Sequence, residues 1–192
     1  MRIESSSTGV NGTEGQGTPG RSVWGIGVFV RLSENLRPFP KQHAFQELLT
    51  DRDGQSHALY IANNDGASSS ILPFGRVQEL YPEISYVGEI GVTSKTLPTF
   101  LSQQKIEVKD YDALVLDTQG SELLILKGAG DLLRNFRFIQ TEAADFESYA
   151  GCCRLSEIDS FLLPRGFQKI ANEEIRSMKN VGTYFEVVYA RR

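Results

Sequence analysis

Short apolar runs alternate with amphipathic segments along most of the chain. Apolar runs bounded by turn residues predict strands, and apolar side chains three and four residues apart predict helices. The predicted strands are Val23–Val30, Ala44–Thr50, Ala58–Ala62, Tyr86–Val92, Ala113–Leu116, Phe138–Thr141, Phe167–Ile170 and Thr183–Ala190. The predicted helices are Arg31–Leu36, Thr96–Gln104, Glu122–Lys127, Ala129–Phe136 and Leu155–Leu163. Such alternation is typical of an α/β fold with a mostly parallel, doubly wound sheet, although the composition of Ala44–Thr50 would equally allow a helix.

The stretch Tyr111–Gly128 carries the strongest pattern in the chain. A buried strand ends at Asp117, a tight turn runs through Gly120, and a short helix is expected to stop at Gly128. Ligands of open α/β sheets bind beyond the carboxyl ends of the strands, where the side chains of Asp117, Gln119 and Glu122 would project. An equally simple interpretation is that Asp117 only caps the turn.

The two ends of the chain differ from this alternating pattern. No full helix is predicted between Phe167–Ile170 and Thr183–Ala190, so these strands are expected to form an antiparallel hairpin at one edge of the sheet. Residues 1–20 are rich in Gly, Ser and Thr and have few large apolar side chains. They are predicted to be a disordered N-terminal tail, which leaves residues 21–192 as one folded domain.

Composition excludes some classes of function. The net charge is −4 and no basic stripe is present, which argues against nucleic-acid binding. No apolar run approaches the roughly 20 residues that span a bilayer, and the N-terminus lacks the apolar segment of a signal peptide, so a cytoplasmic location is expected. Cys152 and Cys153 are adjacent, which disfavours a disulfide between them, and they are expected to be partly buried thiols in a reducing compartment.

Two Gly- and Ser-containing segments suggest ligand contacts. Gly25-x-Gly27 lacks the third glycine of a dinucleotide-binding turn, so it is a weak signal. The segment Asn63–Ser70 consists of small and polar residues and could present several hydroxyls and amides to one ligand. A solvated surface loop is the simpler interpretation of the same segment.

Five short motifs follow one another along the chain. They are Ala67-Ser68-Ser69-Ser70, Leu116-Asp117-Thr118-Gln119-Gly120-Ser121-Glu122, Leu126-Lys127-Gly128-Ala129, Thr141-Glu142, and Leu162 with Gly166-Phe167. With these motifs in this order, the chain resembles the FkbM-type family of S-adenosylmethionine-dependent methyltransferases over about residues 31–190. The resemblance implies a Rossmann-like methyltransferase sheet that ends in an antiparallel hairpin. It further implies S-adenosylmethionine as cofactor and O-methylation of a small molecule or a sugar hydroxyl, so that the partner is a small-molecule or glycan acceptor.

The resemblance also implies roles for individual residues. Asp117 would act as general base or would orient the acceptor, with Glu142 as its partner on the neighbouring strand. Gln119, Gly120 and Ser69, with its neighbours in the serine loop, would contact cofactor or acceptor, and Asp51 could accept from the adenine amino group. Glu122 and Lys127 are expected to form an exposed, structural pair on the helix. The two strand-end carboxylates could instead hold a divalent cation, but with so few ligands no metal is expected.

The sequence departs from the family pattern at its start. The first strand, its glycine turn and its helix are predicted to be missing, and Gly27 stands where the family has a ribose-binding acidic residue. The loss of those charge-assisted hydrogen bonds would weaken cofactor binding. The missing strand would also leave a sheet edge exposed, where a second copy of the chain could pair. The alternative function is therefore a truncated, inactive remnant that acts at most as an interaction module.

Overall fold

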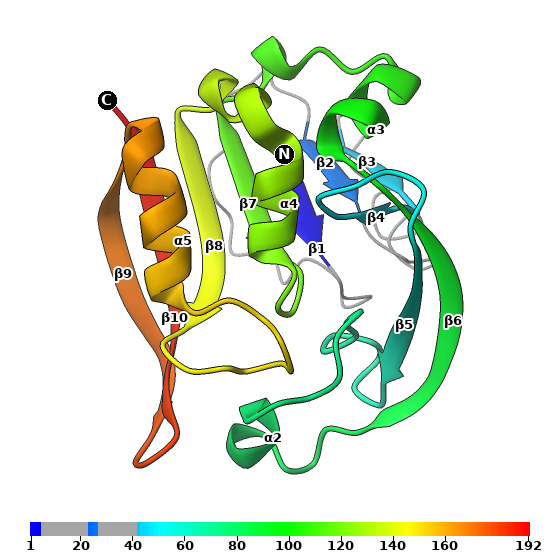
Figure 1. Cartoon of the computed structure of the whole chain (residues 1–192), viewed down its shortest axis with the longest axis vertical. Coiled ribbons are helices and arrows are strands. Elements are labelled where there is room, and N and C mark those ends of the chain that lie inside the picture. The colour runs from blue at the N-terminus through cyan, green and yellow to red at the C-terminus, as the bar shows by residue number, and fades with distance from the viewer. Residues whose placement is uncertain (5–22, 27–41) are drawn as a thin grey trace.

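A computed structural model of the chain describes residues 1–4, 23–26 and 42–192 and contains two β-sheets (Figure 1). The large, seven-stranded sheet has the order β3-β2-β1-β7-β8-β10-β9. Its strands are β1 (Arg2–Glu4), β2 (Val23–Ile26), β3 (Gln42–Phe45), β7 (Ala113–Asp117), β8 (Phe138–Ala144), β9 (Phe167–Met178) and β10 (Gly182–Arg191). The small, three-stranded sheet has the order β4-β6-β5, with β4 (Leu48–Leu49), β5 (Ser56–Ala62) and β6 (Tyr86–Lys95).

Helices and 3₁₀ turns connect these strands. The α-helices are α2 (Val77–Leu80), α3 (Leu97–Gln104), α4 (Glu122–Ala129) and α5 (Leu155–Leu162). The 3₁₀ turns are η1 (Val108–Asp110), η2 (Gly130–Asn135) and η3 (Leu163–Arg165). The chain is thus a mixed α/β protein, as its hydrophobic pattern predicts.

The large sheet is parallel except at its C-terminal edge. Strands β1, β2, β3, β7 and β8 pair in parallel, whereas β10 runs antiparallel to both β8 and β9. The predicted edge hairpin is therefore confirmed, and it is longer than expected. Most of the polar connection expected at residues 172–180 belongs to β9, which continues to Met178.

The prediction that the first strand is missing is wrong. Arg2–Glu4 forms β1 in the interior of the sheet, between β2 and β7, with Glu4 in register with Asp117. Met1 is buried, and its carbonyl accepts a hydrogen bond from Val115 N. A strand of three residues is too short to show a pattern, and the Gly/Ser-rich composition after it favoured disorder. The rest of the expected tail, the expected helix at Arg31–Leu36 and Gly27 lie outside the described residues.

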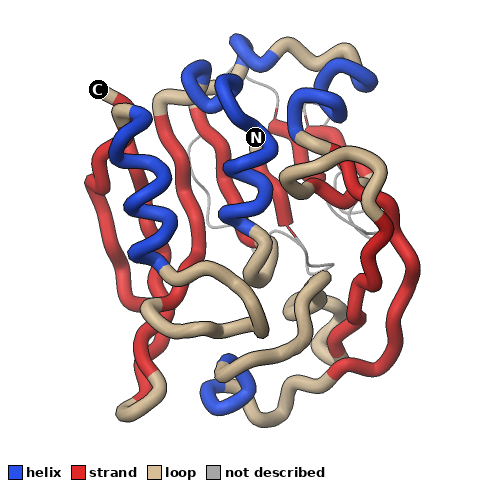
Figure 2. The backbone as a smooth tube through the Cα atoms, in the orientation of Figure 1, coloured by secondary structure: helices blue, strands red, loops and turns tan. Residues whose placement is uncertain are grey.

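One large core lies between the sheet and helices α3, α4 and α5. Leu114 and Leu116 of β7 point into it, and Phe100, Leu126 and Ile158 of the three helices are fully buried there. Figure 2 shows α4 and α5 on the same face of the strands. This strand was recognisable from its continuous apolar run, which predicted burial on both faces, whereas its positions alternate between buried and partly exposed.

The sequence suggested that helix α4 stops at Gly128, but the helix runs past this residue. It continues to Ala129 and ends at Gly130, which has the positive φ of +53°. Gly128 is needed for another reason, because a Cβ at this position would overlap the carbonyl oxygen of Thr50. The glycine therefore allows close packing between the helix and the turn that follows β4.

The small sheet carries the Asn63–Ser70 segment toward the carboxyl ends of the large sheet. Strands β5 and β6 form a long antiparallel pair, and β4 pairs in parallel with β6 only at Ser94 and Lys95. The single strand predicted at Ala44–Thr50 is divided between β3 in the large sheet and β4 in the small one. The strand predicted at Tyr86–Val92 continues to Lys95.

Candidate functional site

Asp117 and Glu142 lie side by side near the carboxyl ends of two parallel strands. Leu116 of β7 is in register with Thr141 of β8, so the two acidic residues follow at the same level. Both line a cleft of about 300 Å³. Glu142 does not end its strand as expected, because β8 continues for two more residues, to Ala144.

Segments from distant parts of the chain form the walls of this cleft. Asn64 and Ser68 come from the segment after β5, Tyr81 follows α2, and Tyr184 lies in β10. In Figure 1, α2 and the tip of the β9–β10 hairpin lie at the lower end of the molecule. The cleft thus has two carboxylates on its floor and mixed polar and aromatic walls.

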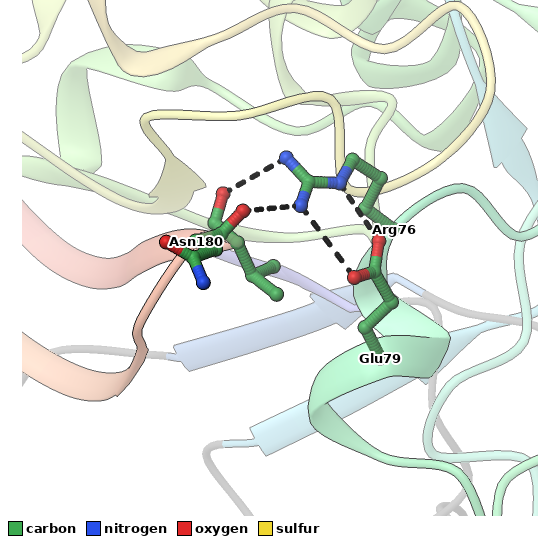
Figure 3. A network of polar contacts seen from close by, with 4 residues as sticks. Arg76, Glu79 and Asn180 are labelled. Carbon is green, nitrogen blue, oxygen red and sulfur yellow. Dashed lines mark hydrogen bonds and ion pairs between the residues drawn. The ribbon is translucent and has the colours of Figure 1, made fainter.

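Arg76 fastens α2 to the β9–β10 hairpin (Figure 3). Its guanidinium donates to the carbonyl oxygens of Asn180 (2.6 Å) and Val181 (3.1 Å), and its Nε donates to Glu79 Oε1 (2.7 Å). A planar guanidinium can satisfy these three acceptors at once because its donors are fixed in one plane. The contact joins α2, which carries the cleft-lining Val77, to the hairpin, which carries Tyr184, and it was not recognisable from the sequence.

The turn after β7 is held in an unusual backbone conformation. Gln119 has φ +53° and the next residue, Gly120, has φ +102°. Positive φ costs a residue with a side chain roughly 1–2 kcal/mol, so Gln119 needs compensating contacts. It receives them from Ser70, whose hydroxyl donates to the Gln119 carbonyl oxygen (2.7 Å), and from its own side chain.

The side chain of Gln119 links Asp117 to Tyr149. Gln119 Nε2 donates to Asp117 Oδ1 (2.7 Å), and the Tyr149 hydroxyl donates to Gln119 Oε1 (2.6 Å). Tyr149 is fully buried, and burial raises its pKa well above the ordinary value, so its hydroxyl remains a donor. This chain of hydrogen bonds fixes the orientation of the Asp117 carboxylate. No pattern in the sequence indicated that Tyr149 contributes to the site.

The sequence suggested that Glu122 is exposed on the helix, but its side chain is buried beneath the turn. Its Oε1 accepts from Thr118 N (2.9 Å) and Thr118 Oγ1 (3.1 Å), and both carboxylate oxygens lie 3.1 Å from Gly120 N. Burial raises the pKa of this carboxyl group, and the nearby negative charge of Asp117 adds to the rise. Glu122, which comes shortly after the Asp-x-x-Gly motif, thus stabilises the turn through these hydrogen bonds.

The three hydroxyls of the serine loop point in different directions. Ser68 lines the cleft, and its Oγ accepts from Asn64 Nδ2 (3.0 Å). Ser69, the predicted cofactor contact, is fully buried, and its Oγ accepts from Ala62 N (3.1 Å). The Ser70 hydroxyl donates to the Gln119 carbonyl oxygen. The structure therefore places Ser69 inside the loop and brings Ser68 to the cleft instead.

Asp51 and Gly120, also expected to contact the cofactor, have other surroundings. Asp51 packs against Gly128 in the last turn of α4, roughly 9 Å along the helix from Glu122, and its carboxylate lies 3.6 Å from Arg52. It is not among the residues that line the cleft. A Cβ on Gly120 would approach Tyr149 and Cys152 to 3.1 Å, so this glycine admits the neighbouring segment.

Neither a metal cluster nor a membrane-spanning helix is present in the part of the chain that the structure describes. Within residues 1–4, 23–26 and 42–192, no three His, Cys, Asp or Glu side chains are grouped so that they could hold a metal ion. No helix of these residues is long and apolar enough to cross a membrane. Cys152 and Cys153 are both free thiols.

Comparison with known families gives one match. A model of the methyltransferase FkbM domain matches residues 25–169, which is more than half of the chain. The chain belongs to the FkbM methyltransferase family. The comparisons with curated proteins and with solved structures gave no match.

The match to the FkbM domain covers the floor of the cleft. It runs from β2 to the start of β9 and includes Asp117, Gln119 and Glu142. Ile175 and Tyr184, on the hairpin side of the cleft, lie beyond it. Within this FkbM protein, the acidic floor therefore belongs to the family domain, and part of the wall does not.

Proposed function

We propose that this FkbM protein is an S-adenosylmethionine-dependent methyltransferase that methylates a hydroxyl group of a small molecule or a sugar. One observation carries the proposal, namely that Asp117 and Glu142 line the same cleft from adjacent parallel strands. Methyl transfer to a hydroxyl requires an oriented acceptor and a group that takes up its proton. Carboxylates fixed at the end of a sheet are suited to both tasks.

The strand order supports a Rossmann-like methyltransferase sheet. Strands β2 and β3 lie on one side of β1, whereas β7 and β8 lie on the other, so the order reverses between β1 and β7. Ligands of open α/β sheets bind at such a switch point, beyond the carboxyl ends of the strands. Asp117 ends β7 at this point, next to Glu4 at the end of β1.

The residues at this end of the sheet fit the cofactor in chemical terms. Carboxylate and amide oxygens accept hydrogen bonds from the ammonium and hydroxyl groups that S-adenosylmethionine carries. When bound, this cofactor supplies a methyl group on a positively charged sulfur for in-line displacement. A cleft of about 300 Å³ is at the lower end of the range for ligand sites, which suits a small acceptor beside the cofactor.

Asp117 is the proposed general base or acceptor-orienting group. Gln119 Nε2 holds Oδ1 of its carboxylate at 2.7 Å, and Tyr149 holds Gln119 in turn. Glu142 lies beside Asp117 and would accept a second hydroxyl of the acceptor. Two fixed acceptors would set the angle at which the acceptor oxygen faces the methyl group.

The inactive-remnant alternative rested in part on a missing first strand. Because β1 occupies the interior of the sheet, the open edge that would have marked a truncated fold is filled.

The partly buried, free thiols of Cys152 and Cys153 fit a reducing compartment, so we propose that the protein is cytoplasmic.

Calorimetric titration of the folded chain with S-adenosylhomocysteine tests the cofactor. We expect saturable one-to-one binding that Glu107→Gln, at an exposed residue outside the cleft, leaves unchanged. With methyl-labelled cofactor and a panel of hydroxylated acceptors, Asp117→Asn should lower kcat by about 10²–10⁴-fold. A cooperatively unfolding chain that does not bind S-adenosylhomocysteine would refute the proposal.

A further inference from the structure

Tyr184 lies on the same face of the large sheet as Glu142. It is in register with Ala144 of β8, and Glu186, two residues further along β10, is in register with Glu142. Opposed residues of an antiparallel pair share a face, and so do alternate residues of one strand. Tyr184 is therefore a diagonal neighbour of Glu142, and both residues line the cleft.

The ring of Tyr184 is fixed, whereas its hydroxyl group is not used within the chain. The residue is 7% exposed, and its ring packs edge-on against Phe146, with 6.4 Å between the ring centroids. No group of the described residues makes a hydrogen bond with the Tyr184 hydroxyl. Within these residues, His57 Nε2 is the one fully buried side-chain nitrogen or oxygen that lacks a partner, so the Tyr184 oxygen is not sealed inside the protein. The hydroxyl therefore opens into the cleft that the residue lines.

This hydroxyl remains protonated and can donate a hydrogen bond. Burial raises the pKa of Tyr184 well above its ordinary value, and the negative charges of Glu122, Glu142 and Asp117 add to the rise. Ionised carboxylates only accept hydrogen bonds, whereas a protonated phenol can donate one. A ligand that satisfies both sides of the cleft therefore offers a donor to the carboxylates and an acceptor oxygen to Tyr184.

The hairpin side of the cleft also carries apolar surface. Ile175 of β9 lines the cleft and is 45% exposed, and Tyr81, after α2, lines it as well. The guanidinium of Arg176 lies 4.5 Å from the centre of the Tyr81 ring, and Arg76 binds the tip of the hairpin (Figure 3). These contacts hold the hairpin against the α2 segment, so Ile175 and Tyr184 form a preorganised wall.

The strand order places Tyr184 on the acceptor side of the cleft. In the proposed function, the cofactor binds at the switch point between β1 and β7. Strand β10 is separated from β7 by β8, so Tyr184 lies two strands away from β7. It also lies outside the segment that matches the FkbM domain, which ends at residue 169. A residue outside the family domain is suited to contact the acceptor, because one fold can serve different substrates.

We propose that Tyr184 selects a polyol acceptor, such as a sugar ring, by donating a hydrogen bond to an oxygen beside the hydroxyl that is methylated. Under the methyltransferase function proposed above, on which this inference rests, the methylated hydroxyl faces Asp117 and Glu142. A second oxygen of the same molecule accepts from Tyr184, and the C–H face of the ring packs on Ile175. Tyr184 binds and orients the acceptor and takes no part in the proton transfer.

Two other classes of acceptor fit the cleft less well. An apolar molecule with a single hydroxyl would displace water from Tyr184 without offering it an oxygen, and a buried donor left unpaired lowers affinity. An acceptor with a phosphate or carboxylate group would bring that group near the negative charges of Asp117 and Glu142. A neutral polyol avoids both costs.

Methyl transfer from labelled S-adenosylmethionine to two matched probes tests this selection. Vicinal cyclohexanediol and cyclohexanol have the same ring and differ by one oxygen. We expect kcat/KM of wild type to be about tenfold higher for the diol, which is the equivalent of one hydrogen bond. Tyr184→Phe, which removes only the hydroxyl, should lower kcat/KM for the diol by about the same factor and leave that for cyclohexanol unchanged.

Two controls separate recognition of the acceptor from other effects. Tyr60→Phe removes a tyrosine hydroxyl on β5, at a residue that does not line the cleft, and should behave as wild type with both probes. Tyr184→Phe should unfold at the same urea concentration as wild type and bind S-adenosylhomocysteine equally tightly. Both expectations follow because the hydroxyl has no partner within the described residues.

The outcomes distinguish this selection from the proposed function. A chain that binds S-adenosylhomocysteine but methylates no diol, prefers cyclohexanol, or keeps its preference for the diol in Tyr184→Phe would overturn the selection alone. An equal loss with both probes in Tyr184→Phe would overturn it too, since Tyr184 would then have only a structural role. A folded chain that does not bind S-adenosylhomocysteine would overturn the proposed function and the selection together.

Discussion

The buried carboxyl group of Glu122 allows a sharp test of the turn after β7. Its oxygens accept from the backbone N–H groups of Thr118 and Gly120 and from the Thr118 hydroxyl. Burial raises its pKa above the ordinary value of 4.5, with Asp117 as a further cause. Glu122→Gln keeps an acceptor oxygen at the same position and removes the titration.

The sign of the pH effect follows from this raised pKa. Between pH 4.5 and the pKa of the folded protein, the native state binds a proton that the unfolded chain releases. The contribution of Glu122 to the free energy of unfolding is therefore complete below pH 4.5. It declines as the pH rises through the pKa of the folded state. Each unit of pKa difference corresponds to about 1.4 kcal/mol, and the glutamine variant has no such dependence.

Urea unfolding of wild type and Glu122→Gln at several pH values between 4.5 and 8 measures this difference. We expect the free energy of unfolding of wild type to fall relative to the variant as the pH rises. Glu107→Gln, at an exposed residue that pairs with Lys109, is the matched control and should run parallel to wild type. A difference that stays constant with pH, or grows in favour of wild type, would refute the reasoning. It would mean that the hydrogen bonds outweigh burial.

Three further substitutions test contacts at the site and in the packing of the chain. Tyr149→Phe leaves Gln119 Oε1 without its buried donor, so we expect a loss of about 1–3 kcal/mol in urea unfolding and a fall in kcat larger than any change in KM. Gly128→Ala forces a methyl group against the Thr50 carbonyl and should cost about 1–3 kcal/mol. Gly88→Ala, in open space, should instead stabilise by about 0.4–1 kcal/mol. Thermal unfolding of the two alanine variants separates these cases.

Elements with a strong local pattern could be predicted from the sequence. Strand β7, helices α3 and α5, and the strands of the C-terminal hairpin all begin within about two residues of their predicted starts. Each begins with a local run or stripe of apolar side chains, and β7, α3 and α5 bury theirs in the large core. The parallel pairing of β7 and β8 followed from the alternation of strands and helices.

Elements defined by distant contacts could not be predicted. Strand β1 has three residues and depends on β2 and β7 for its hydrogen bonds. The end of α4 was misplaced because Gly128 and Gly130 are equally good helix stops in sequence, and only the proximity of Thr50 assigns Gly128 a packing role. Tertiary contacts, rather than local preference, decide these cases.

The candidate site was recognisable only in part for the same reason. Asp117, Gln119 and Glu142 follow from the end of a strand or from the turn after it, and the structure brings all three to one cleft. The directions of consecutive loop side chains have no sequence signal, so Ser69 was chosen where Ser68 reaches the cleft. Asp51 was assigned from the order of elements, and its turn packs on α4; its contact with the cofactor stays a prediction.

The position of Asp117 depends on both walls of the cleft. Ser70, next to the small sheet, holds the Gln119 backbone in its left-handed conformation, and Tyr149, from the segment after β8, holds the Gln119 side chain. Glu122 fixes the turn from below. Each contact is comparable in size with the cost of the strained backbone, so the three together stabilise the turn in this shape. The carboxylate is therefore oriented only in the fully folded domain, which explains why its environment could not be deduced from the Asp-x-x-Gly motif alone.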